Sequence, residues 1–450
     1  MSRPRRLTLL AAILGTSIVF VDMTVVNVAL PSIQRDLGGG LAAQQWVVDA
    51  YLLTLGSLIL VGGSLGDLYG EVRVFALAVA CFGAASALCA AAPGPTTLIA
   101  FRGLQGVAGA LLTPASLAMV TTTFSGVERG TAIGTWTAWS GTATVFGPLL
   151  GGWLIGVWSW RVIFLLNVPV ALATLVIVLG FIPRDGSRDD RVRLDLTGAA
   201  LCAAGLGMLV FGFIEQPRLG WGDPAVSSTL AAGVAALAAF VLYEARVAHP
   251  MLPLRLFTRR NFAVANLETV AVYGALSAWG FFLALFLQQL AGYSPFQAGL
   301  ATLPVTVVMF LNSRLAGRLA ARIGPRLFMA AGPLISGGSL LALARLPPRL
   351  DYWHDLLPPL LGFALGLSLT VAPLTTTVLT DAGPGDAGIA SGVNNAVARI
   401  AGLVAIAIVG IAASGSGNHL STGGFHEAML IVAVLLVAGG LTGALGIRNA

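Results

Sequence analysis

The most informative feature of this 450-residue sequence is how little charge it carries. Charged residues make up 10% of the chain, whereas soluble domains contain about 25%. Hydrophobic residues make up 57%, and the mean hydropathy is +0.88. A soluble core has no use for so much apolar surface. The composition therefore excludes a soluble protein and predicts a membrane protein with many spans.

Lysine is absent, and all 25 basic side chains are arginine. A phosphate-binding loop of the G-x-x-x-x-G-K-[ST] type needs that lysine, so we do not expect this chain to drive transport with ATP. The net charge of +6 comes from short arginine clusters between apolar runs. This distribution does not indicate nucleic-acid binding.

Disulfide partners and metal ligands are scarce as well. There are three cysteines, and Cys81 and Cys89 are separated by about 12 Å along a helix, which is too far for a disulfide. The four histidines lie in or beside loops without the spacing of metal ligands. We therefore expect no metal site and no cofactor.

A membrane-spanning helix needs about 20 mostly apolar residues. Fourteen segments are predicted to meet this requirement, near 7–30, 46–66, 74–92, 97–122, 131–154, 160–182, 195–215, 225–244, 262–288, 296–318, 327–345, 355–380, 388–413 and 425–446. If the N-terminus is cytoplasmic, arginine is concentrated in the inner segments. The positive-inside rule then places both termini in the cytoplasm.

An internal repeat indicates how the spans are grouped. Gly63, Leu65 and Gly70 in GSLGDLYG recur in GRLAARIG, 254 residues later and after the second span of another six-span set. Some secondary transporters contain parallel repeats of this kind. We therefore predict a six-helix bundle in residues 1–183, two additional helices in 184–250 and a second six-helix bundle in 251–450.

The stretch from Gly134 to Gly152, GTWTAWSGTATVFGPLLGG, is apolar but rich in glycine. In a soluble helix each glycine costs about 1 kcal/mol relative to alanine, and an interior proline about 3 kcal/mol. Within lipid, small residues allow helices to approach closely, and neighbouring helices satisfy the carbonyl groups that proline leaves free. We expect a kinked helix packed against a partner, as a structural or a functional seam.

Asp22 lies well inside the first predicted span, in FVDMTVVNVALP. A carboxylate near the bilayer centre costs about 2.5–3.5 kcal/mol on insertion scales, so it is expected to face a cavity or a partner. Arg102, in FRGLQG, is the natural partner, because the two residues lie roughly 8–13 Å below the outer ends of their spans. The pair is either structural or functional.

Three more charged residues lie within predicted spans. Glu268 is on the inner side of the ninth span, where it either acts in transport or extends toward the cytoplasmic interface. Asp49 is expected at the outer interface, and Arg399 needs an acceptor in the thirteenth span. The short inner segment GDLYGEVR holds Asp67 and Arg73, which are either a conformational latch near a helix N-terminus or solvated charges.

Aromatic and amide side chains within the spans are candidates for a substrate cavity. Most aromatic residues in membrane proteins pack or face lipid, but a subset around a central cavity would suit large, mostly apolar ligands. The candidates are Asn27, Tyr51, Gln105, Trp136, Trp139, Tyr273, Gln288 and Asn394.

Several segments together resemble the fourteen-span drug:proton antiporter family of the major facilitator superfamily. The family's first-span signature is similar to VDMTVVNVALP in this chain, and the start of the family's second span is similar to QQWVVDAYLL. The fourth-span motif resembles RGLQGVAGALLTPASLA, and the antiporter motif resembles GPLLGG. Signatures of the second half resemble LQQLAGYSPFQAGLATLP and GIASGVNNAVARIAG.

The resemblance implies an all-α major facilitator fold with alternating access between two six-helix bundles. It implies proton-coupling roles for Asp22 and Arg102, to which we add Glu268. The family's inner loop reads D-R-x-G-R, whereas Leu68 and Glu71 stand at its basic positions here. The predicted antiporter motif is Gly141, Gly147, Pro148, Gly151 and Gly152, and the predicted latch is Gly63, Asp67, Gly70 and Arg73.

The expected protein is a monomeric multi-pass transporter of the bacterial cytoplasmic membrane, not an enzyme. It would export hydrophobic or cationic small molecules, such as drugs or antibiotics, using the proton gradient. Its other partners would be protons and the lipid bilayer. An importer or uniporter of a small metabolite is the alternative, which the antiporter motif disfavours. A channel or a membrane enzyme finds no supporting motif.

Overall fold

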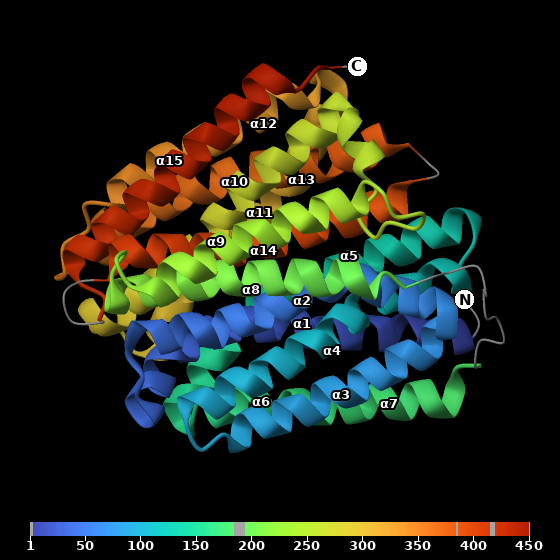
Figure 1. Ribbon diagram of the computed structural model, residues 1–450, viewed down its shortest axis with the longest axis horizontal. Helices are drawn as coiled ribbons and strands as arrows, with labels where there is room; N and C mark the ends of the chain where they lie inside the picture. Colours follow the sequence, from blue (N-terminus) through green and yellow to red (C-terminus); the bar gives the residue numbers. More distant parts are fainter. Residues whose placement is uncertain (1–2, 184–193, 384–385, 415–418, 450) are drawn as a thin grey trace.

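A computed structural model describes residues 3–183, 194–383, 386–414 and 419–449 (Figure 1). The helices are α1 (Arg3–Leu37), α2 (Gly40–Tyr69), α3 (Glu71–Ala91), α4 (Pro95–Thr123), α5 (Gly126–Val157), α6 (Arg161–Leu165), α7 (Asn167–Phe181), α8 (Leu196–Leu219), α9 (Pro224–Glu244), η1 (Leu254–Thr258), α10 (Arg260–Leu285), η2 (Phe286–Leu290), α11 (Pro295–Ile323), α12 (Pro325–Leu343), η3 (Tyr352–Leu356), α13 (Leu357–Ala382), α14 (Ala387–Ala413) and α15 (Thr422–Gly446). The predicted all-helical membrane fold is confirmed.

Thirteen helical segments of the described residues are long and apolar enough to cross a membrane. The one predicted span that is not among the thirteen is 131–154, which corresponds to α5, a helix of 32 residues whose described apolar part is only Phe146–Val157. The predicted span 160–182 is divided into α6 and α7. Pro169 explains this division, because it has no N–H group to donate to the carbonyl of Leu165.

The long helices form two sets that pack against each other. In the N-terminal set (α1–α7), α2 packs on α4 and α1 on α5, and in the C-terminal set (α10–α15), α12 packs on α13 and α15. Figure 1 shows the first set below and the second above. The sets meet along two lines, where α2 packs on α14 and α5 packs on α11.

The additional helices α8 and α9 pack on each other and lie between the two sets in Figure 1. Their close approach depends on glycine: a Cβ atom on Gly233 would lie 2.9 Å from the carbonyl oxygen of Gly205. The same α8 contacts both α2 and α14. This pair therefore covers one of the two lines along which the sets meet.

The internal repeat appears as a matching turn in each set. Gly70 joins α2 to α3 with φ 92° and ψ 132°, and Gly324 joins α11 to α12 with φ 101° and ψ 149°. Positive φ values of this kind strongly favour glycine, which has no Cβ atom. The repeated glycine is thus explained by a one-residue connection between consecutive spans.

The start of α1 and the end of α15 lie at the same end of the bundle (Figure 1), which we call the terminal end. Arg5 near the start of α1 pairs with Glu128 near the start of α5 at 2.9 Å. After α15, the carbonyl of Arg448 accepts a hydrogen bond from Asn261 at the start of α10 at 3.1 Å. The opposite end, where α1 finishes and α2 begins, is called the far end.

Candidate functional site

Asp22, in the middle of α1, is buried against Arg102 of α4, with 0% and 1% of their side chains exposed. Oδ2 of Asp22 accepts a hydrogen bond from Nη1 of Arg102 at 2.5 Å. Nε of the guanidinium donates to the carbonyl of Val47 on α2 at 3.0 Å. The ring of Tyr51 lies 4.2 Å away and covers the same guanidinium. The two residues therefore form a buried ion pair between helices.

Three neutral side chains complete the surroundings of the carboxylate. Gln105 donates to Oδ1 of Asp22 at 2.9 Å and Asn167 at 3.2 Å. Both amides also donate to Oγ of Ser86, at 2.8 and 3.3 Å. We call Asp22, Arg102, Gln105, Ser86 and Asn167 the polar core, and all five side chains are buried.

The charged pair of the polar core joins α1 to α4. Both oxygens of Asp22 accept hydrogen bonds, from Arg102 and Gln105. A proton on Asp22 would leave the Arg102 guanidinium buried without its counter-charge, which is strongly unfavourable. Loss of either charge would therefore destabilise the contact between α1 and α4.

Ser86 on α3 and Asn167 at the start of α7 are members that sequence reasoning missed. Each is a single small polar residue in an apolar helix. Neither belongs to a spacing pattern that distinguishes it from residues that bond their own helix backbone. Their depth in the spans, comparable with that of Asp22, was the only available signal.

A central cavity of about 70 Å³ lies between the two helix sets. Its lining includes the predicted Asn27, Tyr51 and Tyr273, together with Arg102 and Arg399. Ligand pockets for drug-sized molecules usually have about 300–1,000 Å³. The conformation described here is therefore too closed to hold such a molecule.

Arg399 of α14 supplies the cavity with a second guanidinium. Its Nε atom is buried and has no hydrogen-bond acceptor among the described residues. Nη1 points at the sulfur of Met23 at 3.0 Å, and the ring of Phe20 lies 5.7 Å from the guanidinium. The positive charge of Arg399 therefore faces a methionine sulfur and an aromatic ring rather than a carboxylate.

The other predicted cavity residues lie elsewhere in this conformation. Gln105 belongs to the polar core, and Trp139 is 59% exposed on the surface. Trp136 donates to Thr16 at 3.1 Å, Gln288 donates to the carbonyl of Val28 at 3.0 Å, and Asn394 donates to Thr269 at 2.8 Å.

Two buried carboxylates contrast with Asp22. Glu268 on α10 is fully buried, and its Oε2 lies 2.8 Å from where a Cβ on Gly443 of α15 would be, beside the carbonyl of Met329 on α12. Asp49 was expected at an interface, but it is fully buried because α8 and α14 cover the start of α2. None of these four oxygens has a hydrogen-bond partner in the described part of the chain.

The glycine-rich α5 packs on both sets. Any side chain on Gly147 or Gly151 would collide with Thr24 or Val25 of α1. A Cβ on Gly152 would lie 2.6 Å from the carbonyl oxygen of Pro295, at the start of α11.

The contact is reciprocal, because a Cβ on Gly299 of α11 would lie 2.5 Å from the carbonyl oxygen of Pro148. We call Gly147, Pro148, Gly151, Gly152 and Gly299 the α5 seam. Gly141 lies in α5, but its surroundings are outside the described residues.

The predicted latch residues lie at the terminal end of α2 and the start of α3. Gly70 forms the turn, and a Cβ atom added to Gly63 would lie 3.8 Å from the side chain of Pro114 on α4. Asp67 and Arg73 are exposed. Glu71, which replaces a basic residue of the family pattern, accepts a hydrogen bond from Thr122 of α4 at 2.8 Å.

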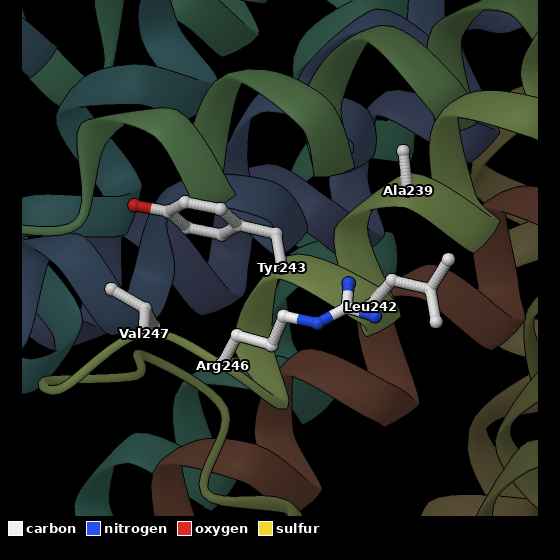
Figure 2. Close-up of a pocket in the computed structure, with 5 residues that line it drawn as sticks. All are labelled: Ala239, Leu242, Tyr243, Arg246 and Val247. Carbon is white, nitrogen blue, oxygen red and sulfur yellow. The ribbon is translucent and has the colours of Figure 1, made fainter.

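A larger hollow of about 480 Å³ lies on the surface at the end of α9. Ala239, Leu242, Tyr243, Arg246 and Val247 line it, and Figure 2 shows these side chains around an open hollow. It lies on an additional helix, outside the boundary between the two sets. The central cavity is therefore the better candidate for a transport site.

Comparisons with known proteins identify the family of this chain. Residues 12–406 match the Major Facilitator Superfamily. A puromycin resistance protein of Streptomyces alboniger is 39% identical over 92% of this chain and 83% of that protein. A cephamycin export protein of Amycolatopsis lactamdurans is 36% identical over 94% and 88%, respectively.

Solved structures show the same fold at low identity. An auto-inhibited POT family peptide transporter superposes with a TM-score of 0.72 at 15% identity, covering 100% of this chain and 98% of that one. The human organic anion transporter MFSD10 gives a TM-score of 0.65 at 14% identity, covering 98% and 100%. Because residues 12–406 match the family and its resistance and export relatives align over most of its length, this chain belongs to the Major Facilitator Superfamily.

Proposed function

We propose that this protein exports hydrophobic or amphipathic antibiotics across the bacterial cytoplasmic membrane in exchange for protons. The relatives named for puromycin resistance and cephamycin export support the direction and the class of cargo. The buried Asp22–Arg102 pair beside the central cavity is the observation that carries the proton-coupling part.

The proposed cycle alternates the partners of Asp22. When Asp22 is ionised, it holds α1 to α4 through Arg102 and Gln105. A proton entering from the outside neutralises Asp22, and the freed guanidinium turns to another acceptor as the helices shift. Release of the proton to the cytoplasm restores the pair. One charge pair in a partly dry cavity easily supplies the 1.36 kcal/mol that each tenfold change in proton affinity requires.

The charge of the cavity indicates which cargo it favours. Its described lining contains two guanidinium groups, from Arg102 and Arg399, with Tyr51 and Tyr273 beside them. Arg102 is neutralised by Asp22, whereas Arg399 faces Met23 and Phe20. We propose apolar, aromatic cargo that is neutral or negatively charged. Binding of cationic cargo by Glu268 would require that carboxylate to turn away from α12 and α15.

The far end of the boundary between the sets is closed by side-chain amides. Gln45 of α2 donates to the carbonyl of Ile406 on α14 at 2.9 Å, and Gln289 donates to Gln34 of α1 at 2.9 Å. With both termini in the cytoplasm, as the arginine distribution indicates, this end faces outward. We propose that the structure represents a closed state from which the terminal end opens.

The proposed organisation keeps residues 1–183 and 251–450 as the two moving bundles, with 184–250 as additional helices. The α5 seam and the latch region of Gly63, Asp67, Gly70 and Arg73 would guide their relative motion. The protein would act as a monomer, because each bundle supplies its own part of the cavity within one chain.

Reconstitution in liposomes tests the proposal. With an imposed proton gradient, the wild type should accumulate a labelled antibiotic and release protons in step with it. Asp22→Asn should still bind cargo but lose both accumulation and proton release. Glu215→Gln is the matched control, because Glu215 forms only a surface pair with Arg218. Gradient-independent flux by the wild type would favour a uniporter, and uphill export by Asp22→Asn would exclude Asp22 as the proton carrier.

A further inference from the structure

Two carboxyl groups meet at the terminal end of the additional helices, away from the central cavity. Asp195 precedes α8, and its Oδ1 accepts a hydrogen bond from the N–H of Gly198 at 2.7 Å. Glu244 is the last residue of α9, and its Oε2 accepts from the N–H of Leu252 at 2.9 Å. Both side chains are buried, with 8% and 3% of each residue exposed. Each carboxyl therefore uses one oxygen to hold the backbone.

The remaining two oxygens face each other across Gly198. A Cβ on Gly198 would lie 2.6 Å from Oδ2 of Asp195 and closer still to Oε1 of Glu244. The two carboxyl groups lie within hydrogen-bonding reach of one another. Neither of these oxygens receives a hydrogen bond from any donor in the described residues. Two buried acceptor oxygens thus lie close together, and no donor among the described residues hydrogen-bonds to either of them.

We infer that Asp195 and Glu244 share one bound proton and form a proton-dependent clasp. Two ionised carboxylates at this separation would repel each other in a buried site, whereas one proton turns one of the oxygens into a donor to the other. Gly198 leaves the space that the pair occupies. Among the described residues, the other titratable group on which the charge of Glu244 acts is the thiol of Cys202 on α8. Arg246 and Tyr243 line the outer hollow instead (Figure 2).

The clasp joins three parts of the chain. It connects the start of α8 to the end of α9, and Glu244 also holds the backbone at Leu252. This segment continues into η1, whose Arg255 binds Asp386 next to the start of α14 at 2.7 Å. A proton lost from the pair would therefore loosen the attachment of α8 and α9 to the C-terminal set. This site lies outside the transport path proposed above and does not depend on it.

Amide substitutions test the shared proton directly. In Glu244→Gln and in Asp195→Asn, an NH₂ group replaces the shared proton as the donor, so the clasp should stay closed at every pH. In Glu244→Ala it should be open at every pH. Glu215→Gln changes a partly buried carboxylate near the opposite end of α8, which pairs with the exposed Arg218, and it should behave as the wild type.

Hydrogen–deuterium exchange of the peptide covering residues 245–258 is the readout, in the full protein in lipid nanodiscs, corrected for intrinsic exchange. As pH rises through the titration, protection in the wild type should fall by up to about tenfold per pH unit, because one proton is linked to closure. Protection in the two amide variants should not change with pH. Infrared difference spectra should show a protonated-carboxyl band in the wild type that Glu244→Gln lacks.

Two results would overturn the inference. The first is an exchange pattern without a shared proton: either protection in the wild type does not change with pH, or the amide variants exchange as fast as Glu244→Ala. The second is protection at high pH that returns when Mg²⁺, Ca²⁺ or Na⁺ is added, because the pair would then bind a cation rather than a proton. Neither readout requires transport, so failure of the clasp and failure of proton-coupled export are distinguishable.

Discussion

Two fully buried carboxyl groups, Asp22 in the N-terminal set and Glu268 in the C-terminal set, have opposite surroundings. In the N-terminal set, Asp22 has a guanidinium and two amide donors, so every oxygen of its carboxylate is satisfied. In the C-terminal set, Glu268 is equally buried but has no donor among the described residues. A satisfied pair is stable as an ion pair and resists change, whereas a carboxyl group without a donor is most stable when it is neutral. The repeat in the backbone has therefore not preserved a repeat in the charges.

The largest effect should come from removing one partner of the satisfied pair. Arg102→Ala leaves a buried ionised carboxylate without its counter-charge, which costs about 3–5 kcal/mol. Thermal unfolding in detergent should show this loss. Adding Asp22→Asn to Arg102→Ala should restore a large part of it, since the uncompensated charge is then gone. A double variant as unstable as the single one would mean that packing, not charge, dominates this site.

The seam between the sets should give the next largest effect. Gly147→Leu places a bulky side chain against Thr24 and should abolish export while leaving membrane insertion intact. Gly156→Leu is the control on the same helix, because nothing lies within 4 Å of a Cβ there. Export assays on correctly inserted protein compare them. Equal activity of the two variants would show that close approach of α5 and α1 is dispensable.

Glu268→Gln should have a small effect on stability, within about 1 kcal/mol, because no hydrogen bond or ion pair is lost. Its melting temperature, compared with that of Asp22→Asn, measures the contrast between the sets. Export of cationic and neutral compounds by the same variant checks whether Glu268 takes part in binding. Selective loss of cationic cargo would place Glu268 in the cavity during the cycle.

The smallest effect should come from the exposed pair Arg255–Asp386. The hydrogen bond and charge of Arg255 hold the pKa of Asp386 below its usual value. The stabilisation is therefore present above the ordinary aspartate range and is lost as pH falls through the lowered pKa. When melting temperatures are measured at a series of acidic pH values, Asp386→Asn should reduce the fall in melting temperature with falling pH. If that fall is the same in the variant and the wild type, other carboxylates cause it.

Part of this contrast follows from the sequence alone. The depth of Asp22 and Arg102 in opposite-running spans was enough to predict that they could meet, because rise per residue fixes depth in a helix. The glycine pattern of α5 predicted close packing but not its partners. Gly299, which packs on Pro148, belongs to a distant span and has no local signal.

Other features depend on which side of a helix faces the interior of the bundle. The sequence of a helix that is apolar on all sides indicates this orientation only weakly. Asp49 lies near the far end of α2, as its position in the sequence indicates, yet it points into the bundle. Trp139 points outward although it lies in the same stretch as the α5 seam. The meeting of Asp195 with Glu244 requires α8 and α9 to close as a hairpin, and only the structure shows that their ends coincide.

The position of α8 makes the two flanks of the transporter unequal toward the bilayer. Along one flank α8 lies against both α2 and α14, so lipid is separated from the boundary between the sets. Along the other flank α5 and α11 meet, and they expose Phe146 at 51%, Trp153 at 50% and Phe310 at 67%. In a bilayer, lipid would therefore contact both sets directly along the α5–α11 flank, whereas α8 would stand between lipid and the boundary on the other flank.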